Sequence, residues 1–316
     1  MLPARYWWLN SKSKEGIYCG RPFRRLAVYQ KSMREPTYRD VSYGPHERNV
    51  IDLYLVDSDA PAPLYLFIHG GGFSGGDKGN IPQDLLEILM EEGISVAAIN
   101  YRLSGTDPYP TAMHDCTYAL QFLRYNAEKW NLDPPRVAAG GGSAGGGITF
   151  WIGFRPDLAD PNSDDPVKQQ STRLTCIGSW NTQSSYDPNF IRTIISGGAY
   201  AHQALQQFFR ATPDEFGTPR AMKIFAEASA INYVSKNSPP VFLWYPRLNV
   251  PMTPDLDANE GIHHPKFGQV LKEKMDELGV ECIVRYREDL PGLPQDEISG
   301  RFFRELVEFV KRHFGI

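Results

Sequence analysis

A serine set among glycines is the feature that most constrains how this 316-residue chain can fold. Residues 136–139, Arg-Val-Ala-Ala, are mainly apolar and predict a buried strand. Residues 141–145 read Gly-Gly-Ser-Ala-Gly, and residues 146–151 predict the start of a helix. A tight turn between strand and helix holds Ser143 in a strained backbone conformation, which requires very small neighbours. The G-x-S-x-G spacing in this context is typical of a turn that presents a nucleophilic serine above a sheet.

A second glycine motif, His69-Gly70-Gly71-Gly72, follows another predicted buried strand at residues 64–68. Backbone N–H groups of such a loop, and of the residue after the nucleophile, can bind the oxyanion that forms when an ester carbonyl is attacked. The donors here would be Gly71, Gly72 and Ala144. Together the two motifs predict an oxyanion hole beside a nucleophilic serine.

With these motifs the chain resembles the α/β-hydrolase superfamily, specifically the HGGG-bearing carboxylesterases related to hormone-sensitive lipase and to bacterial acetyl and feruloyl esterases. Further segments match that pattern in order from about residue 38 onward, at residues 75–78, 100–103, 109–110, 131–134 and 238–243. The resemblance implies an α/β-hydrolase fold, a doubly wound, mainly parallel sheet with a helical cap insertion. It also implies ester hydrolysis without a cofactor, and a structural role for His69.

The chain departs from the family pattern where the other two members of a catalytic triad belong. Register after the predicted strand at residues 241–245 places Asn249 where the family has its aspartate. The loop after the last strand, residues 288–294, contains no histidine, and His313 lies near the end of the terminal helix, where a solvated role is expected. Because a serine hydroxyl is a poor nucleophile without a base, an active enzyme needs a histidine from elsewhere.

His263 and His264 end a long loop that follows the predicted strand at residues 241–245, and we expect this loop to leave the same sheet edge as Ser143. One of them can serve as a relocated base, oriented by Asp255 or Asp257. The first alternative is a structural role at a helix start, which the following proline favours. The second is a metal site, because adjacent histidines near carboxylates are suitable ligands. The three interpretations remain open, and the overall expectation is that the site holds no metal.

Length and alternation favour a single domain over residues 1–316. Predicted strands and helices alternate and so predict a mainly parallel sheet covered on both faces, after a hairpin at residues 37–43 and 50–56. Helices are expected at residues 83–92 and 111–130, and strands at residues 95–100 and 173–179. Between residues 181 and 235 the alternation gives way to helical segments at 190–209 and 219–230, the predicted cap. Its Phe208, Phe209 and Phe216 would either line the acyl side of a pocket or form the core of the cap.

Charge and cysteine content narrow the function classes. A net charge of −4 and a pI near 6.0 predict no nucleic-acid surface, and no apolar run approaches the length of a membrane span. The four cysteines, Cys19, Cys116, Cys176 and Cys282, suggest no disulfide framework. The first residues lack the apolar core of a signal peptide, so a soluble protein is expected, in the cytoplasm or secreted if a leader was lost.

Two functional hypotheses follow from these observations. The first is a serine carboxylesterase that acts on short acyl esters, including acylated carbohydrates, as a monomer or a homodimer. The second is a catalytically impaired descendant that keeps the pocket as a binding protein but lacks the usual histidine and aspartate.

Overall fold

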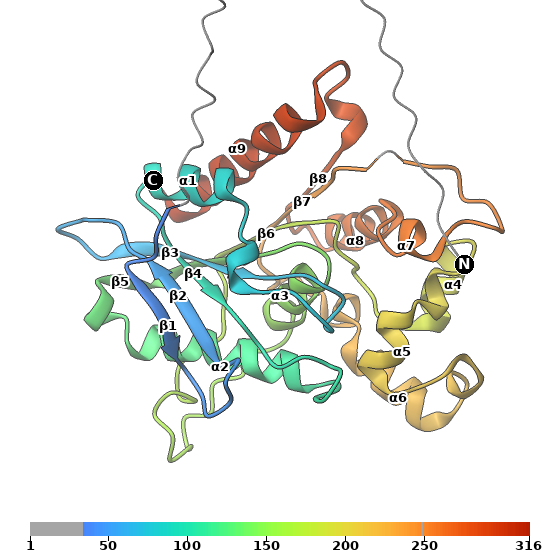
Figure 1. The fold of residues 1–316 in the computed structure, drawn as a ribbon, viewed down its shortest axis with the longest axis horizontal. Coiled ribbons are helices and arrows are strands. Elements are labelled where there is room, and N and C mark those ends of the chain that lie inside the picture. Colours follow the sequence, from blue (N-terminus) through green and yellow to red (C-terminus); the bar gives the residue numbers. More distant parts are fainter. Residues whose placement is uncertain (1–33, 248) are drawn as a thin grey trace, which may run out of the picture. The chain divides into compact units, whose positions relative to one another are not determined.

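The computed structural model describes residues 34–247 and 249–316. The start of the chain, with its expected lack of a signal peptide, and Cys19 lie outside the described residues. Strands and helices alternate along the described part of the chain (Figure 1). The strands are β1 (Tyr38–Ser42), β2 (Val50–Tyr54), β3 (Ala62–Ile68), β4 (Ser95–Ile99), β5 (Leu132–Gly140), β6 (Cys176–Trp180), β7 (Val241–Tyr245) and β8 (Cys282–Tyr286). The α-helices are α1 (Gln83–Glu91), α2 (Thr111–Tyr125), α3 (Ala144–Phe154), α4 (Pro188–Ile194), α5 (Gln203–Phe209), α6 (Pro219–Ala228), α7 (Ala258–Gly261), α8 (Lys266–Glu277) and α9 (Gln295–Phe314).

Within these residues the strands form one eight-stranded sheet in the order β1-β2-β4-β3-β5-β6-β7-β8. The predicted hairpin β1–β2 is antiparallel at one edge, and β2 pairs antiparallel with β4. From β4 to β8 every neighbouring pair is parallel, which confirms the predicted sheet. Because parallel strands end at the same edge, the loops after β3, β5, β6, β7 and β8 all leave that edge together.

Side chains on the central strand β3 alternate between two separate cores. Leu64, Leu66 and Ile68 pack in the core that α2, α3 and α8 cover, whereas Tyr65 and Phe67 pack in the core under α1 and α9. Successive side chains of a strand point to opposite faces, so a strand with both faces covered is apolar at every position. Figure 1 shows α1 beside α9 on one face of the sheet and α2 and α3 on the other.

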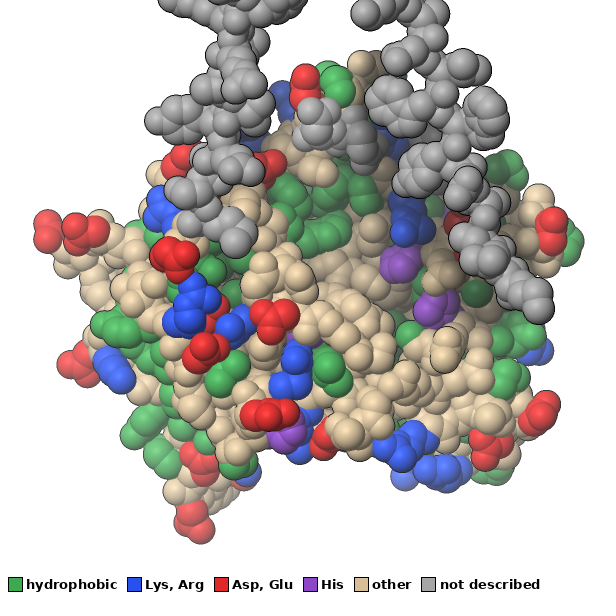
Figure 2. Space-filling view, viewed as in Figure 1, with side chains coloured by type: hydrophobic (Ala, Val, Ile, Leu, Met, Phe, Trp, Pro, Cys, Tyr) green, Lys and Arg blue, Asp and Glu red, His purple; other side chains and the backbone are tan. Residues whose placement is uncertain are grey.

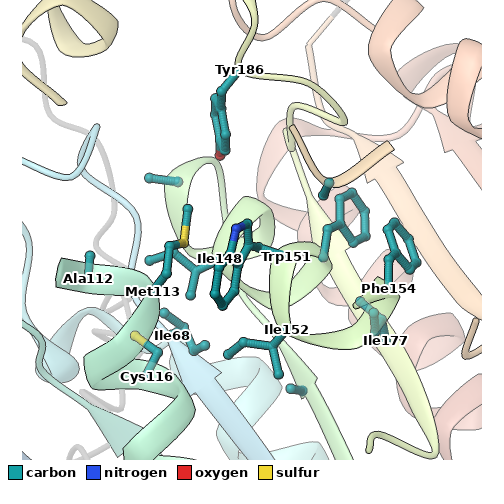
Figure 3. Packing of buried hydrophobic residues seen from close by; sticks show 14 of the residues in the cluster. Ile68, Ala112, Met113, Cys116, Ile148, Trp151, Ile152, Phe154, Ile177 and Tyr186 are labelled. Atoms are coloured by element: carbon teal, nitrogen blue, oxygen red, sulfur yellow. The ribbon is translucent and has the colours of Figure 1, made fainter. Parts of the chain in front are cut away.

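Helix α3, which begins directly after Ser143, is buried along its whole length. Figure 3 shows its Ile148 and Ile152 near Met113 and Cys116 of α2, in the core beneath the end of β3. The predicted helix at residues 111–130 thus buries Met113, Cys116, Ala119, Leu120 and Leu123 against this core. Since every side of α3 contacts protein, the turn at its N-terminus is fixed in place.

The segment between β6 and β7 is mainly helical, as predicted, and includes α4, α5 and α6. The expected helical segment at residues 190–209 is divided into α4, a 3-10 turn at Ala199–Ala201 and α5, and the break between them contains Gly197, which has a φ of 79°. A Cβ there would lie 2.3 Å from the carbonyl oxygen of Leu256, so the break lets the loop after β7 approach closely. The predicted helix at residues 111–130 also ends early, at Tyr125, and a separate 3-10 turn covers Glu128–Trp130.

Three cysteines, Cys116, Cys176 and Cys282, are buried and free. Among the described residues, no helix has both the length and the apolar character that crossing a bilayer requires.

Candidate active site

Ser143 occupies the sharp turn between β5 and α3. Its φ of 53° and ψ of −121° are rarely adopted by residues with a side chain, a strain on the order of 1–3 kcal/mol. The turn is held by a hydrogen bond from the Ser143 N–H to the carbonyl oxygen of Trp180 (3.0 Å). Gly145 is required because a Cβ there would lie 2.0 Å from the carbonyl oxygen of Ile68. The elbow is therefore built by close contact between the start of α3 and the end of β3.

The glycine loop after β3 brings backbone N–H groups to the cavity that contains Ser143. Gly71 and Gly72 have φ values of 105° and 59°, and a Cβ on Gly71 would lie 2.4 Å from the carbonyl oxygen of Gly75. Gly71, Gly72 and Ala144 line the same cavity as Ser143. Within the part of the chain that the structure describes, none of their three N–H groups donates to a protein acceptor. All three are available to a ligand oxygen.

His69, at the start of this loop, is fully buried and makes structural contacts. Its ring stacks on Tyr101, with centroids 4.3 Å apart. Arg48 can only donate, so His69 Nε2 accepts from the guanidinium (3.2 Å) and Nδ1–H donates to the carbonyl oxygen of Gly70 (2.7 Å). Burial, reinforced by Arg48, lowers the pKa of His69 to about 4. A neutral imidazole thus anchors the glycine loop.

His263 lies beside the serine. Its Nε2 is 3.0 Å from Ser143 Oγ, and its Nδ1 is 2.9 Å from the carbonyl oxygen of Asn259. A carbonyl oxygen accepts only, so Nδ1 carries the hydrogen and the Nε2 lone pair faces the serine hydroxyl. This is the tautomer that a general base needs.

Contacts from the helical segment between β6 and β7 fix the short helix α7 and the histidine that follows it. The buried Gln183 donates from Nε2 to the carbonyl oxygen of Ile262 (2.5 Å). His202, which accepts at Nδ1 as the N-cap of α5, donates from Nε2 to Asn259 Oδ1 (3.0 Å). Both contacts hold residues that precede His263 in the sequence, Asn259 through its side chain and Ile262 through its backbone.

Burial is the main cause that lowers the pKa of His263. The hydrogen bond to the carbonyl oxygen of Asn259 opposes this shift, and the charges of Arg247 and His202 add to it. The imidazole is therefore neutral at pH 7, the form that can accept the serine proton.

His264, the second expected base, faces away from the serine. It is buried, accepts at Nδ1 from the Lys266 N–H (3.1 Å), and donates from Nε2 to the carbonyl oxygen of Val250 (3.1 Å). These are the helix-start contacts of the structural interpretation. Because the two imidazoles have different partners, the described residues do not bring them together as metal ligands.

The expectation of a carboxylate behind the base is not met by Asp255 or Asp257. Asp257 Oδ1 accepts the Asn259 N–H (2.8 Å) and caps α7, while Asp255 bonds to Thr253. Both carboxylates are exposed, so they keep their hydration and local backbone bonds rather than reaching a buried imidazole. The main-chain carbonyl of Asn259 takes the place expected for them.

The usual triad positions hold no substitute within the described residues. Asn249 is exposed, and its N–H donates to Glu288 Oε1 (2.6 Å). His313 lies near the C-terminus of α9, where its Nε2 is 3.0 Å from Glu281 Oε2, and it makes no contact with Ser143 within the described residues.

Two cavities meet at Ser143. One, of about 240 Å³, is lined by the glycine loop, His263, Tyr186 and Leu205. The other, of about 340 Å³, is lined by the opposite side of the glycine loop together with Trp180 and Asn181. The first has apolar and aromatic side chains together with the polar Gln183, His202 and Asn259, whereas the second presents an indole and an amide.

Phe208, Phe209 and Phe216, the alternative pocket residues, line neither cavity at Ser143. They are buried and pack on one another through Phe225, in the core of the segment between β6 and β7.

Sequence analysis did not single out Gln183, His202 and Asn259. Gln183 bonds to Ile262 and His202 to Asn259, contacts that join positions 79 and 57 residues apart, and the acceptor for His263 Nδ1 is the main-chain carbonyl of Asn259. No motif or spacing in the sequence indicates such a contact.

Comparison with known proteins places this site in a family. The BD-FAE family model matches residues 51–247, from β2 through the elbow to the end of β7. The chain belongs to the BD-FAE family. Among its relatives, the probable carboxylic ester hydrolase LipM of Mycobacterium tuberculosis is 25% identical over 230 residues, 72% of this chain and 50% of LipM. The carboxylesterase NlhH of the same organism is 36% identical over 88 residues, 28% of this chain and 27% of NlhH.

Solved structures share the fold of this BD-FAE chain. A truncated carbohydrate esterase from gut microbiota superposes with a TM-score of 0.70 at 17% identity, over 90% of this chain and 98% of that one. An acetyl ester-xyloside bifunctional hydrolase from Caldicellulosiruptor lactoaceticus gives 0.62 at 19%, over 87% and 98%. At these identities the likeness establishes the α/β-hydrolase fold. The chain spans about half the length of LipM, although the match covers most of this chain.

Proposed function

We propose that this protein is a serine carboxylesterase that cleaves short acyl esters through Ser143. The observation that carries the proposal is the 3.0 Å contact between Ser143 Oγ and a neutral His263 Nε2 at a strained elbow. A serine and a base at this distance form the pair that nucleophilic catalysis requires. Relatives named as carboxylic ester hydrolase and carboxylesterase support the same reaction class.

In the proposed reaction, Ser143 Oγ attacks the ester carbonyl while its proton passes to His263 Nε2. The N–H groups of Gly71, Gly72 and Ala144 bind the oxyanion of the tetrahedral intermediate. The imidazolium then donates its proton from Nε2 to the leaving alcohol, which departs and leaves an acyl-serine. Water attacks the acyl group with His263 again acting as base, and this step releases the acid.

The cavity of about 240 Å³ supports a short acyl group. Tyr186 and Leu205 line it, and Phe73 closes it from the glycine loop. Phe73 stacks on Phe208 at 3.7 Å between centroids, so the packed core of the segment between β6 and β7 backs this wall. We therefore assign that segment the role of a cap over the acyl cavity.

The cavity of about 340 Å³ supports a carbohydrate as the alcohol. Trp180 offers a flat apolar face, and the Asn181 side-chain oxygen is buried without a hydrogen-bond partner among the described residues. An unpaired buried acceptor is costly, and a substrate hydroxyl would satisfy it. The carbohydrate esterase and the acetyl ester-xyloside hydrolase that share this fold are named for such substrates.

The competing hypothesis, a binding protein without catalysis, depended on the missing histidine. The Ser143–His263 pair weakens that argument, since a ligand-binding descendant has no need of a base hydrogen-bonded to a strained serine.

Hydrolysis of p-nitrophenyl acetate by wild type, Ser143→Ala, His263→Ala and His264→Ala tests the proposal. We expect the first two variants to lose about a hundredfold or more in kcat/KM. His264→Ala is the matched control. It removes the neighbouring imidazole and a helix cap, so it should lower the melting temperature and retain activity in the folded protein at 20 °C. Wild-type rates equal to those of Ser143→Ala, for this ester and for acetylated xylose, would overturn the proposal.

A further inference from the structure

A separate cavity of about 480 Å³ shares His263 with the catalytic pair. Arg247, two residues after β7, and Arg287, directly after β8, line it together with Glu260. Both arginines lie at the sheet edge from which Ser143 projects after β5. Figure 2 shows histidine side chains gathered beside a basic side chain on the face drawn. This cavity belongs neither to the acyl pocket nor to the Trp180 cavity.

Its charge is unbalanced. In the described residues the Arg247 guanidinium has no hydrogen-bond or ion-pair partner. Its positive charge acts on His263 and lowers the pKa of that imidazole. Arg287 is half-buried and held by bonds from Nη1 and Nη2 to the carbonyl oxygens of Leu290 (3.2 Å) and Leu293 (3.4 Å). A guanidinium has five N–H donors, so Arg287 keeps donors for a ligand while its position is fixed.

Glu260 is the one acidic side chain that lines the cavity, and it forms no ion pair within the described ranges. With neutral histidines the cavity therefore carries one net positive charge from Arg247, Arg287 and Glu260. Paired arginines with unused donors suit a planar carboxylate, which each can bind through two parallel hydrogen bonds.

The strand order gives the distance between this cavity and the serine. Strands β5, β6, β7 and β8 are successive neighbours, and neighbouring strands lie about 4.8 Å apart, so Arg247 and Arg287 begin roughly 10 and 14 Å along the edge from Ser143. His263 lies between, and it must protonate the leaving alcohol. Trp180 and Asn181, at the end of β6, lie along the edge between Ser143 and the arginines, so an alcohol part held in the Trp180 cavity is the part that can extend toward them.

We propose that this cavity binds a carboxylate on the alcohol part of the substrate, so that the enzyme prefers esters of acidic alcohols such as an acylated uronic acid. This proposal rests on the proposed function, because it assumes that His263 serves Ser143. It assigns Arg247 and Arg287 to substrate selection and gives them no part in bond cleavage.

The test compares 4-acetoxybenzoate with its neutral methyl ester, methyl 4-acetoxybenzoate, at the acetyl group that both share. We expect wild type to favour the anion in kcat/KM, and Arg247→Gln and Arg287→Gln each to lower the anion-to-neutral ratio about fivefold or more. Glu260→Gln should raise the ratio. Removal of Arg247 also changes the pKa of His263, but this affects both substrates equally and cancels in the ratio.

Arg301→Gln is the matched control, since Arg301 pairs with Glu305 on α9 and does not line the cavity, so its ratio should equal that of wild type. Equal ratios in wild type and both cavity variants would overturn the inference and leave the esterase proposal intact. Calorimetric binding of 4-hydroxybenzoate to Ser143→Ala tests the anion site independently of the esterase proposal. Binding that Arg247→Gln abolishes supports the anion site even if no ester is cleaved, and absence of binding together with equal ratios counts against it.

Discussion

At the scale of single residues, the distinctive atom of this site is a main-chain oxygen. His263 Nδ1–H points at the carbonyl of Asn259, where most serine hydrolases place a carboxylate. A carbonyl dipole fixes the ring and its tautomer as a carboxylate does, but it carries no full charge to stabilise the imidazolium. The Asn259 carbonyl thus orients the imidazole but does not supply the negative charge that a carboxylate would.

This separation predicts that neither nearby aspartate matters for turnover. Asp255→Asn and Asp257→Asn should each keep kcat/KM for p-nitrophenyl acetate within about twofold of wild type. An asparagine at position 257 can still cap α7, because its side-chain oxygen accepts the same N–H. If a carboxylate oriented His263, the loss would be on the order of ten-thousandfold. Steady-state kinetics at pH 8, with folding checked by circular dichroism, distinguishes the two.

At the scale of elements, α3 and the chain after β6 pack closely against each other where α3 has glycines instead of larger side chains. A Cβ on Gly147 would lie 1.7 Å from the hydroxyl oxygen of Tyr186, and Figure 3 shows that ring directed toward α3. The same tyrosine lines the acyl cavity. The helix that follows the proposed nucleophile thus also sets the position of a cavity wall.

Gly147→Ala should therefore lower both stability and activity. Alanine favours a helix over glycine by about 1 kcal/mol, but overpacking costs about 1–3 kcal/mol and displaces Tyr186. We expect a lower melting temperature and a fall of at least fivefold in kcat/KM for acetyl esters. Gly217→Ala is the control, because nothing lies within 4 Å of its Cβ and it should behave as wild type. A Gly147→Ala protein as active and stable as this control would contradict the fit.

At the scale of the whole molecule, the buried His69 makes stability depend on pH. Its pKa is about 4 in the folded protein, against 6.5 in the unfolded chain. Above pH 6.5 both states are neutral there. As pH falls from 6.5 to 4 the unfolded chain binds a proton that the folded protein excludes, so the free energy of unfolding falls by about 3 kcal/mol in total.

Urea unfolding at pH 7 and pH 4.5 measures this effect. His69→Gln should be less stable than wild type at pH 7, since it loses the stack on Tyr101, yet it should lose less stability between the two pH values. Equal losses in both proteins would show that His69 does not contribute to the acid sensitivity.

The fold could be predicted from the sequence because its signals are local. The glycine turns, the apolar runs and the strand–helix alternation each report on a few consecutive residues, and the sheet from β3 to β8 follows from them. The site could be predicted only in part. Ser143, the glycine loop and the pair His263 and His264 could be identified from motifs and loop position, but sequence spacing does not give the distances between them in space. Which histidine faces the serine depends on Gln183 and His202, which reach α7 and the residue after it from distant segments of the chain.

The carbonyl behind His263 also changes how this site would appear in a genetic experiment. Every amino acid has a backbone carbonyl, so nearly any codon at position 259 supplies the acceptor, and only the side-chain bond to His202 would be lost. Among the positions of the proposed triad, saturation mutagenesis should therefore find two that are indispensable, 143 and 263, where a motif search expects three. Residue 259 can therefore be replaced repeatedly during evolution while the enzyme stays active at every step.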